Sequence, residues 1–189
     1  MARMFLIQFL FFGLFLTFEA RAIGVHGGVN LGTMPAGSSI ALGFAFGVQH
    51  TFSLSGFHVV ANAEFVKRSY NYVGTAFGTV TYTPSYYVIE LPLLLKIGDG
   101  KSLPALLIGP DPQLNISSSC SSASATNGCS LRPADLISFS VQGGLTREFK
   151  IGAFRTYLEG RYSYQLIGPS STNSNLKLNG FMFLAGVDF

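Results

Sequence analysis

The sequence contains few charged residues and, beyond its N-terminal segment, no long apolar run. Charged side chains make up 11% of its 189 residues, and the mean hydropathy is +0.40, which is an odd composition for a water-soluble domain. After residue 22 the longest apolar run is Leu91 to Leu95, which contains Pro92 and is far shorter than the roughly 20 residues of a transmembrane helix. If the chain crosses a membrane, we therefore expect it to use strands, because only a closed barrel pairs every backbone group without helices.

Cysteine is also scarce, since Cys120 and Cys129 are the only two in the chain. Both lie in the Ser-rich stretch from Ser117 to Ser130. A disulfide between them, formed in an oxidising compartment, is the simple interpretation. A metal site is the alternative, but no histidine or carboxylate lies among these residues, so we favour the disulfide.

The N-terminal segment has the order of features of a cleavable secretory signal. One arginine precedes a mostly apolar run over residues 4–18, and Ala20 and Ala22 are small residues at the spacing that a signal peptidase requires. A membrane-anchoring helix or a buried core helix is the alternative, but two charged residues end the apolar run early. We therefore predict a signal peptide over residues 1–22. The remaining residues, 23–189, carry ten basic and eight acidic side chains, a balance too weak to indicate a nucleic-acid partner.

The mature sequence divides into about eight segments with the length of a tilted membrane-spanning strand. These segments are Ile23 to Gly32, Ile40 to Ser53, Phe57 to Tyr72, Pro84 to Ile97, Leu103 to Asn115, Leu136 to Phe149, Gly152 to Leu166 and Leu176 to Phe189. They predict an all-β fold, an eight-stranded antiparallel up-and-down transmembrane β-barrel. The fifth segment is the least regular, because Pro104, Pro110 and Pro112 weaken its ladder and its alternation is not clean.

Apolar and polar side chains alternate along most of these segments. In the seventh, Leu158, Tyr162 and Tyr164 share one face, and charged or polar residues share the other. Soluble barrels such as lipocalins also alternate, but they hold apolar residues inside, whereas outer-membrane barrels place them outside. Most of the charge lies on the polar face, which favours a filled polar interior. The predicted interior network consists of Glu64, Arg68, Glu90, Lys96, Glu148, Arg155, Glu159 and Arg161.

The connections between the segments alternate between short and long. Short turns are expected at Leu54 to Gly56, Gly98 to Ser102 and Lys150-Ile151, and long loops near Val73 to Thr83, Ile116 to Asp135 and Ile167 to Asn175. Outer-membrane barrels have short periplasmic turns and long outer loops, so both termini are predicted on the periplasmic side. Beside these turns and the C-terminus we expect an interfacial aromatic girdle of Phe52, Phe57, Phe149, Phe154 and Phe189. Near the opposite ends we expect Tyr87, Tyr162 and Tyr164 to face outward.

Two sequence resemblances point to the same class of protein. The C-terminal stretch resembles the closing strand of Gram-negative outer-membrane proteins, which implies recognition by the barrel-assembly machinery through Phe181, Phe183, Val187 and Phe189. The residues 24–31, Tyr87 to Lys96 and Gly109-Pro110 resemble PorT-like outer-membrane β-barrel domains. That resemblance implies the barrel and the membrane. Most members of the group have no assigned activity, and a few assist protein secretion.

No arrangement of residues indicates catalysis. His50 and His58 lie near one predicted turn and His26 on the first segment, but we favour polar rim residues over a metal site. Glu64 and Glu90 are explained by ion pairing, and no G-x-S-x-G motif occurs. We therefore predict a non-enzyme without cofactor that is monomeric in the lipids of the bacterial outer membrane.

An eight-stranded barrel is filled by its own side chains, so no substantial pore is expected. The predicted role is structural or interactive, with surface loops that bind an unknown surface or periplasmic protein and with a part in secretion or envelope integrity. A narrow channel and a lipid-modifying barrel enzyme are the alternatives.

Overall fold

The computed structural model describes residues 20–33, 38–54, 57–74, 80–122, 136–168 and 177–189. Its strands are β1 (Ala20–Thr33), β2 (Ser38–Leu54), β3 (Phe57–Gly74), β4 (Val80–Glu90), β5 (Leu93–Ile97), β6 (Ala105–Ser122), β7 (Ile137–Ile151), β8 (Phe154–Ile167) and β9 (Asn179–Asp188). In the part of the chain that the structure describes, no helix is long and apolar enough to cross a membrane.

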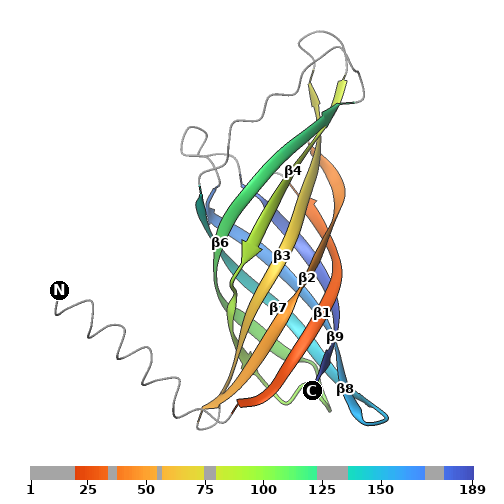
Figure 1. Ribbon diagram of the computed structural model, residues 1–189, viewed down its shortest axis with the longest axis vertical. Coiled ribbons are helices and arrows are strands. Elements are labelled where there is room, and N and C mark those ends of the chain that lie inside the picture. The colour runs from red at the N-terminus through yellow and green to blue at the C-terminus, as the bar shows by residue number, and fades with distance from the viewer. Residues whose placement is uncertain (1–19, 34–37, 55–56, 75–79, 123–135, 169–176) are drawn as a thin grey trace, which may run out of the picture.

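The strands form one closed antiparallel barrel (Figure 1). Each strand pairs with its neighbours along the chain, and β1 pairs with β9 to close the sheet. β4 and β5 are two parts of one strand, because both pair with β3 on one side and with β6 on the other. The barrel is therefore eight-stranded, which confirms the predicted fold class.

The interruption between β4 and β5 lies opposite the prolines of β6. Ladder pairing of β6 with this strand stops after Glu90↔Gln113 and resumes at Leu95↔Ile108. The gap is bridged by a hydrogen bond from the Leu91 N–H to the Pro112 carbonyl, with an N···O distance of 3.0 Å. Proline has no N–H to donate, so a proline beside this gap removes few of the hydrogen bonds between the two strands.

The predicted limits of several segments were wrong at their ends. The fifth segment begins later and runs further than expected, to Ser122, and its side chains do alternate, with Asp111 and Gln113 inside and Pro110 and Pro112 outside. Residues 116–122 are therefore strand rather than loop. The turn expected at Lys150-Ile151 lies instead at residues 152 and 153, where Gly152 has a φ of 62°. β1 begins at Ala20, within the predicted signal peptide, and residues 1–19 lie outside the described part of the chain.

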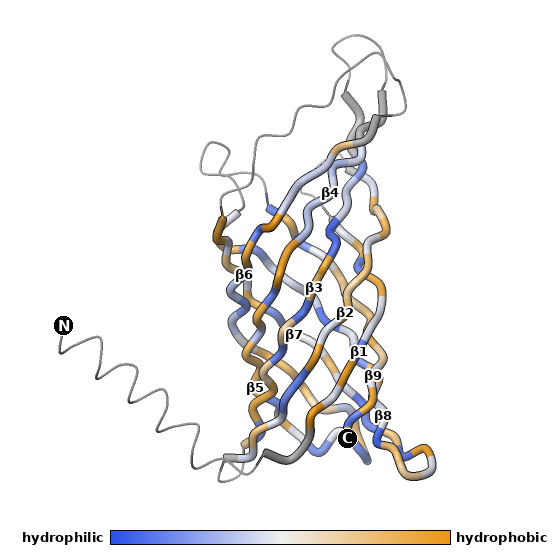
Figure 2. The backbone as a smooth tube through the Cα atoms, viewed as in Figure 1, coloured by the Kyte–Doolittle hydropathy of each residue, from blue (hydrophilic) through white to orange (hydrophobic). Residues whose placement is uncertain are grey.

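The outer surface is apolar and the inner surface is mostly polar. Along β8, Leu158 and Leu166 are about half exposed on the outside, whereas Ser163 and Gln165 are fully buried inside. Figure 2 shows the alternating colours along the strands. Exposed apolar side chains surround the barrel, for example Val29, Phe46, Phe57, Leu93, Ile108, Leu145, Leu158 and Phe183. This is the distribution that hydrocarbon favours, and it confirms the predicted orientation of the two faces.

Apolar side chains also occupy part of the interior. Towards the turns, Val60, Leu94 and Leu107 form one buried cluster. Towards the loops, a second buried cluster contains Tyr70 and Tyr86. Along β3, the inward residues between Val60 and Tyr70 are polar except Val66, which belongs to a third buried cluster with Ala45, Met182 and Leu184. The polar part of the interior therefore has an apolar layer towards each end and apolar side chains at its own level.

The apolar outer band ends below the loop-side tips of the longest strands. On β6 the exposed residues change from Leu114 and Ile116 to Ser117 and Ser119, beyond an irregularity in its pairing with β4. β3, β4 and β6 continue upward past the ends of the other strands in Figure 1, and β3 stays paired with β4 as far as Gly74↔Val80. The serine-rich end of β6 therefore projects beyond the apolar band.

Candidate functional site

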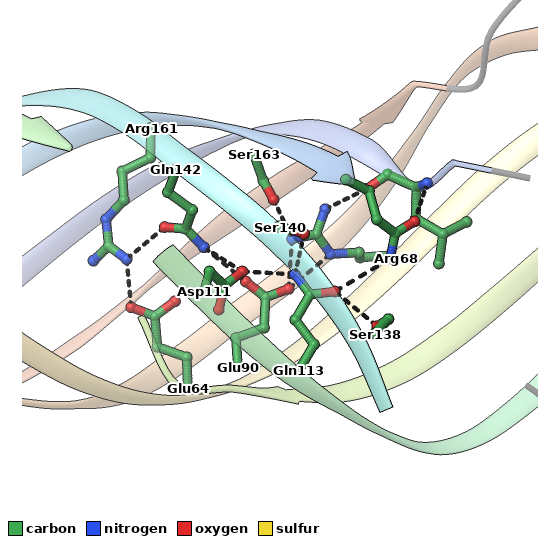
Figure 3. A network of polar contacts seen from close by, with 12 residues as sticks. Glu64, Arg68, Glu90, Asp111, Gln113, Ser138, Ser140, Gln142, Arg161 and Ser163 are labelled. Atoms are coloured by element: carbon green, nitrogen blue, oxygen red, sulfur yellow. Dashed lines mark hydrogen bonds and ion pairs between the residues drawn. The ribbon is translucent and has the colours of Figure 1, made fainter. Parts of the chain in front are cut away.

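The interior contains a polar network that is organised around two buried arginines. Arg68 of β3 is fully buried and donates from Nε to Glu90 Oε1 at 2.7 Å. Its two terminal nitrogens donate to the Leu178 carbonyl at 2.8 Å and to Ser163 Oγ at 3.1 Å. One guanidinium thus joins β3, β4, β8 and the segment before β9 (Figure 3).

The second arginine, Arg161 of β8, lies nearer the turns. Its Nη1 donates to Glu64 Oε1 at 2.7 Å and to Gln142 Oε1 at 3.2 Å, and its Nε is paired with Glu159. Glu64 Oε1 also lies 3.2 Å from Nε2 of His26, whose Nδ1 is 3.0 Å from the Tyr157 hydroxyl oxygen. These contacts connect β1, β3, β7 and β8 across the interior.

Gln142 connects the two arginine centres. It accepts a hydrogen bond from Arg161 and donates from Nε2 to Glu90 Oε2 at 3.0 Å, while the other oxygen of Glu90 accepts from Arg68. The same Nε2 lies 2.9 Å from Asp111 Oδ2. Figure 3 shows this chain of contacts between Glu64 and Arg68. The network is therefore continuous rather than a set of separate ion pairs.

Neutral side chains compensate for an excess of carboxylates. The Arg68 and Arg161 guanidinium groups face four buried acidic residues, and Asp111 has no arginine hydrogen-bonded to it. Its Oδ2 instead accepts from Gln113 Nε2 at 2.6 Å and from Gln142. Gln113 also donates to Ser140 Oγ at 2.8 Å. Such donors offset part of the cost of burying these charges, while Asp111 Oδ1 and Glu64 Oε2 have no hydrogen-bond partner among the described residues.

Two glycines make room for the large charged side chains. Gly47 is the register partner of Glu64, and Gly144 is the register partner of Arg161. A Cβ on Gly47 would lie 2.9 Å from both Cα and Cγ of Glu64, and one on Gly144 would lie 2.9 Å from Cα of Arg161. Any side chain at either position would therefore compete with an ion of the network.

The predicted interior residues fall into three groups. Glu64, Arg68, Glu90, Glu159 and Arg161 come together in the network. Lys96 and Glu148 form a separate ion pair with each other towards the turns. Arg155 faces the same side but is exposed, and it lines the opening at the turn side with Lys96 and Glu148, so it does not belong to the buried network.

The sequence interpretation missed Asp111, Gln113 and His26 as interior residues. The prolines on either side of Asp111 hid the alternation of β6, although inward-facing positions 107, 109, 111, 113 and 115 keep a strict period of two. His26 lies four residues before the buried Asn30, so both point to the inward face of β1. The alternation along the sequence could have shown this. Its pairing with Glu64 depends on strand register, which the pattern does not give.

The barrel opens on the turn side through a polar pocket of about 150 Å³, here called the turn-side mouth. It is lined by Thr51, Ser53, His58, Lys96, Asp99, Lys101, Glu148, Arg155 and Asp188. In the turn after β5, the backbone N–H of Lys101 donates to Asp99 Oδ1 at 3.0 Å. That hydrogen bond lowers the pKa of Asp99 from its usual value.

The two histidines near the first turn lie on opposite faces. His58 lines the turn-side mouth and lies 3.0 Å from Ser53 Oγ through its Nδ1. His50 follows the inward-facing Gln49 and its ring stacks edge-on against Phe52, with 4.4 Å between ring centres. In the described ranges, no group of three or more His, Cys, Asp or Glu side chains is placed to hold a metal ion.

The predicted girdle and closing-strand residues lie on the outer surface. Phe57, Phe149, Phe154 and Phe189 are each more than 40% exposed, and Phe52 is half-buried. At the loop-side ends, Tyr164 is exposed while Tyr87 and Tyr162 are half-buried. Phe181 and Phe183 are also exposed, and Val187 is half-buried, on the strand that closes the barrel. The roles of these residues at an interface and in assembly stay predictions.

The disulfide prediction is not tested by the structure. Cys120 lies in β6, opposite Pro84 of β4, whereas Cys129 lies outside the described residues. β6 continues past Cys120 to Ser122.

No protein-family model matches the chain, and no curated protein matches it. Among solved structures, the chain is similar to a crystal structure of Ail, the attachment invasion locus protein of Yersinia pestis, in complex with the heparin analogue sucrose octasulfate. The two chains are 15% identical with a TM-score of 0.43, and the match covers 89% of this chain and 97% of the other. The PorT-like resemblance stays a prediction, and a similarity of this size carries no information about function.

Proposed function

We propose that the chain is a small bacterial outer-membrane β-barrel protein with a structural or interaction role, in which a sealed barrel carries surface-exposed loops. The observation that carries this proposal is the distribution of side chains, with apolar residues exposed around the outside and charged residues buried inside. A closed sheet with this distribution satisfies its backbone in hydrocarbon and hides its charges from it.

The filled interior favours a scaffold over a channel. The polar network crosses the interior from β3 to β8, and buried apolar clusters lie above and below it. Water-filled pores occur in barrels with more strands, whereas eight strands leave space only for side chains. A solute would have to break the ion pairs and hydrogen bonds that cross the interior.

The loop side is the proposed interaction surface. The serine-rich end of β6 projects beyond the apolar band, so the connection 123–135 begins outside that band. Binding residues commonly lie on loops that a rigid scaffold positions. The turn side, which has the shorter connections and the C-terminus, then faces the periplasm.

The membrane part of the proposal is tested with purified protein. We expect folding in detergent micelles with a heat-dependent shift in gel mobility, and no stable unitary currents in planar bilayers. A folded monomer in plain buffer would contradict the membrane assignment. Stable currents would favour the channel, and lipid turnover by the purified protein would favour the enzyme.

The interaction part is tested in cells. A strain in which residues 123–135 are replaced by the same number of glycine and serine residues should lose surface binding or secretion function, while its barrel still folds and reaches the outer membrane. The matched control has residues 169–176, a shorter connection at the same end, replaced in the same way. If neither strain differs from the parent in binding or secretion, the proposed role of the loops is wrong.

A further inference from the structure

The outer surface of the barrel is hollowed near its turn side, where β7, β8, β9 and β1 lie side by side. Gly27 and Ala185 are register partners and place almost no side chain on the outer face. Larger apolar residues around them, among them Val25, Phe149 and Leu158, form the walls of a hollow of about 520 Å³. A smooth lipid-facing strand surface would have no such depression.

Among the residues that the structure describes, one outward-facing cation lies beside this hollow. Arg147 is exposed on the same face as Leu145 and Phe149. Its guanidinium carbon lies 5.6 Å from the centre of the Phe149 ring, which lines the hollow. Its register partner is Leu158, another wall residue. A permanent charge is costly in hydrocarbon, so this side chain requires a polar or anionic partner at the interface.

The other charges nearby leave this end of the β7–β8 hairpin positive. Glu148 is paired with Lys96 on the interior side. Lys101, Lys150 and Arg155 line a second pocket, of about 410 Å³, that also includes Phe149. No acidic side chain among the described lining residues of the hollow opposes Arg147. Figure 2 shows the hydrophobic tip of the same hairpin below β8.

We infer that the hollow binds one phospholipid of the periplasmic leaflet, with an acyl chain along Gly27 and Ala185 and the phosphate on Arg147. The inference rests on the proposed membrane location. An apolar depression next to a cation has the complementarity of a phospholipid, because chain methylenes gain from burial and the phosphate gains a charge-assisted hydrogen bond. The ring of Phe149, which lines the hollow, holds the guanidinium beside it through its face.

The site is tested by native mass spectrometry of protein purified from outer membranes and exchanged into maltoside micelles. Phosphatidylglycerol and a diacylglycerol with the same chains are titrated in parallel. We expect one tightly bound phosphatidylglycerol and much weaker binding of the phosphate-free lipid. Arg147→Ala should weaken phosphatidylglycerol binding about fivefold, the factor typical of one cation near a charged lipid surface.

A second variant fills the hollow without disturbing the fold. A Cβ on Gly27 would meet nothing closer than 3.7 Å, so Gly27→Leu adds a side chain on the open outer face. It should lower the affinity about tenfold for both lipids, because it occupies the acyl-chain space.

Matched controls exist for both changes. Lys177→Ala removes a cation that lies 5.3 Å over Tyr164 on the loop side, and Gly143→Leu adds an outward leucine away from the hollow. Both controls should bind lipid like the parent. If Arg147→Ala and Gly27→Leu also bind like the parent, the site does not exist. That result would leave the membrane assignment intact, because heat-dependent gel mobility reports barrel folding separately.

Discussion

The ion pairs in the middle of the barrel and the ion pair at its turn-side mouth are chemically alike but differ in their access to water. Arg68–Glu90 and Arg161–Glu64 have no exposed side-chain surface beyond 1%. Lys96 and Glu148 retain 10% and 16% and line a pocket that opens to solvent. Burial, not charge type, therefore separates the two regions.

This difference decides what each region contributes. When one partner of a fully buried pair is removed, the other is left charged in a medium that cannot solvate it. When a partner at the mouth is removed, water replaces it. We therefore expect the middle network to determine the stability of the barrel, and the mouth to tolerate change.

The sharpest test of this comparison uses two arginines of the same strand and the same face. Arg161→Ala should lower the free energy of unfolding by about 3–5 kcal/mol, because Glu64 and Glu159 lose their buried partner. Arg155→Ala, at the exposed mouth, should change it by at most about 0.5 kcal/mol. Urea unfolding in detergent, followed by gel mobility, measures both. Equal effects for the two variants would remove the distinction between the regions.

A smaller effect is expected from crowding the network without removing a charge. Gly47→Ala should destabilise the barrel by about 1–3 kcal/mol, because the new Cβ would press on Glu64 and on the Ala63 carbonyl. Gly27→Ala is the matched control on the outer face, where the same atom meets only ordinary contacts. The same unfolding assay applies. A Gly47→Ala variant as stable as its control would show that the network has free space.

The smallest effect is expected at the mouth. Glu148→Gln removes the charge that pairs with Lys96 and should cost about 1 kcal/mol at low salt, because the amide still accepts a hydrogen bond. The cost should shrink as salt rises, since a pair that is open to solvent is screened. Unfolding measured at two salt concentrations tests this. A loss as large as that of Arg161→Ala, with no salt dependence, would place the mouth within the buried network.

How much was predictable differs between strands. The alternation of β7 and β8 was strong enough to assign both faces correctly, because all their charged residues except the outward-facing Arg147 share one parity. β6 was assigned less well, since its prolines suggested a weak ladder. They are tolerated there because the partner strand is itself interrupted at Leu91 and Pro92. Which residues lie opposite the prolines depends on how the two strands pair, and neither segment shows this by itself.

The sequence predicted which residues belong to the candidate network but not which of them contact one another. Glu64, Arg68, Glu90, Glu159 and Arg161 were all placed in the interior by parity alone. Their partners were not, because Arg68 meets Ser163 and Leu178 across 95 and 110 residues of sequence. The sequence also does not show how deep each inward residue lies in the barrel, so Arg155 was grouped with residues that lie deeper.

The sequence by itself determined the class of fold and the orientation of its faces. A strand exposes alternate residues to opposite sides, so a period of two in polarity fixes which side chains meet lipid and which lie inside. The tertiary structure decided which inward residues touch, where a glycine is needed opposite a large ion, and where an outer hollow lies beside Arg147. Those features depend on register and closure between strands that are distant in the chain, and a local pattern carries no information about either.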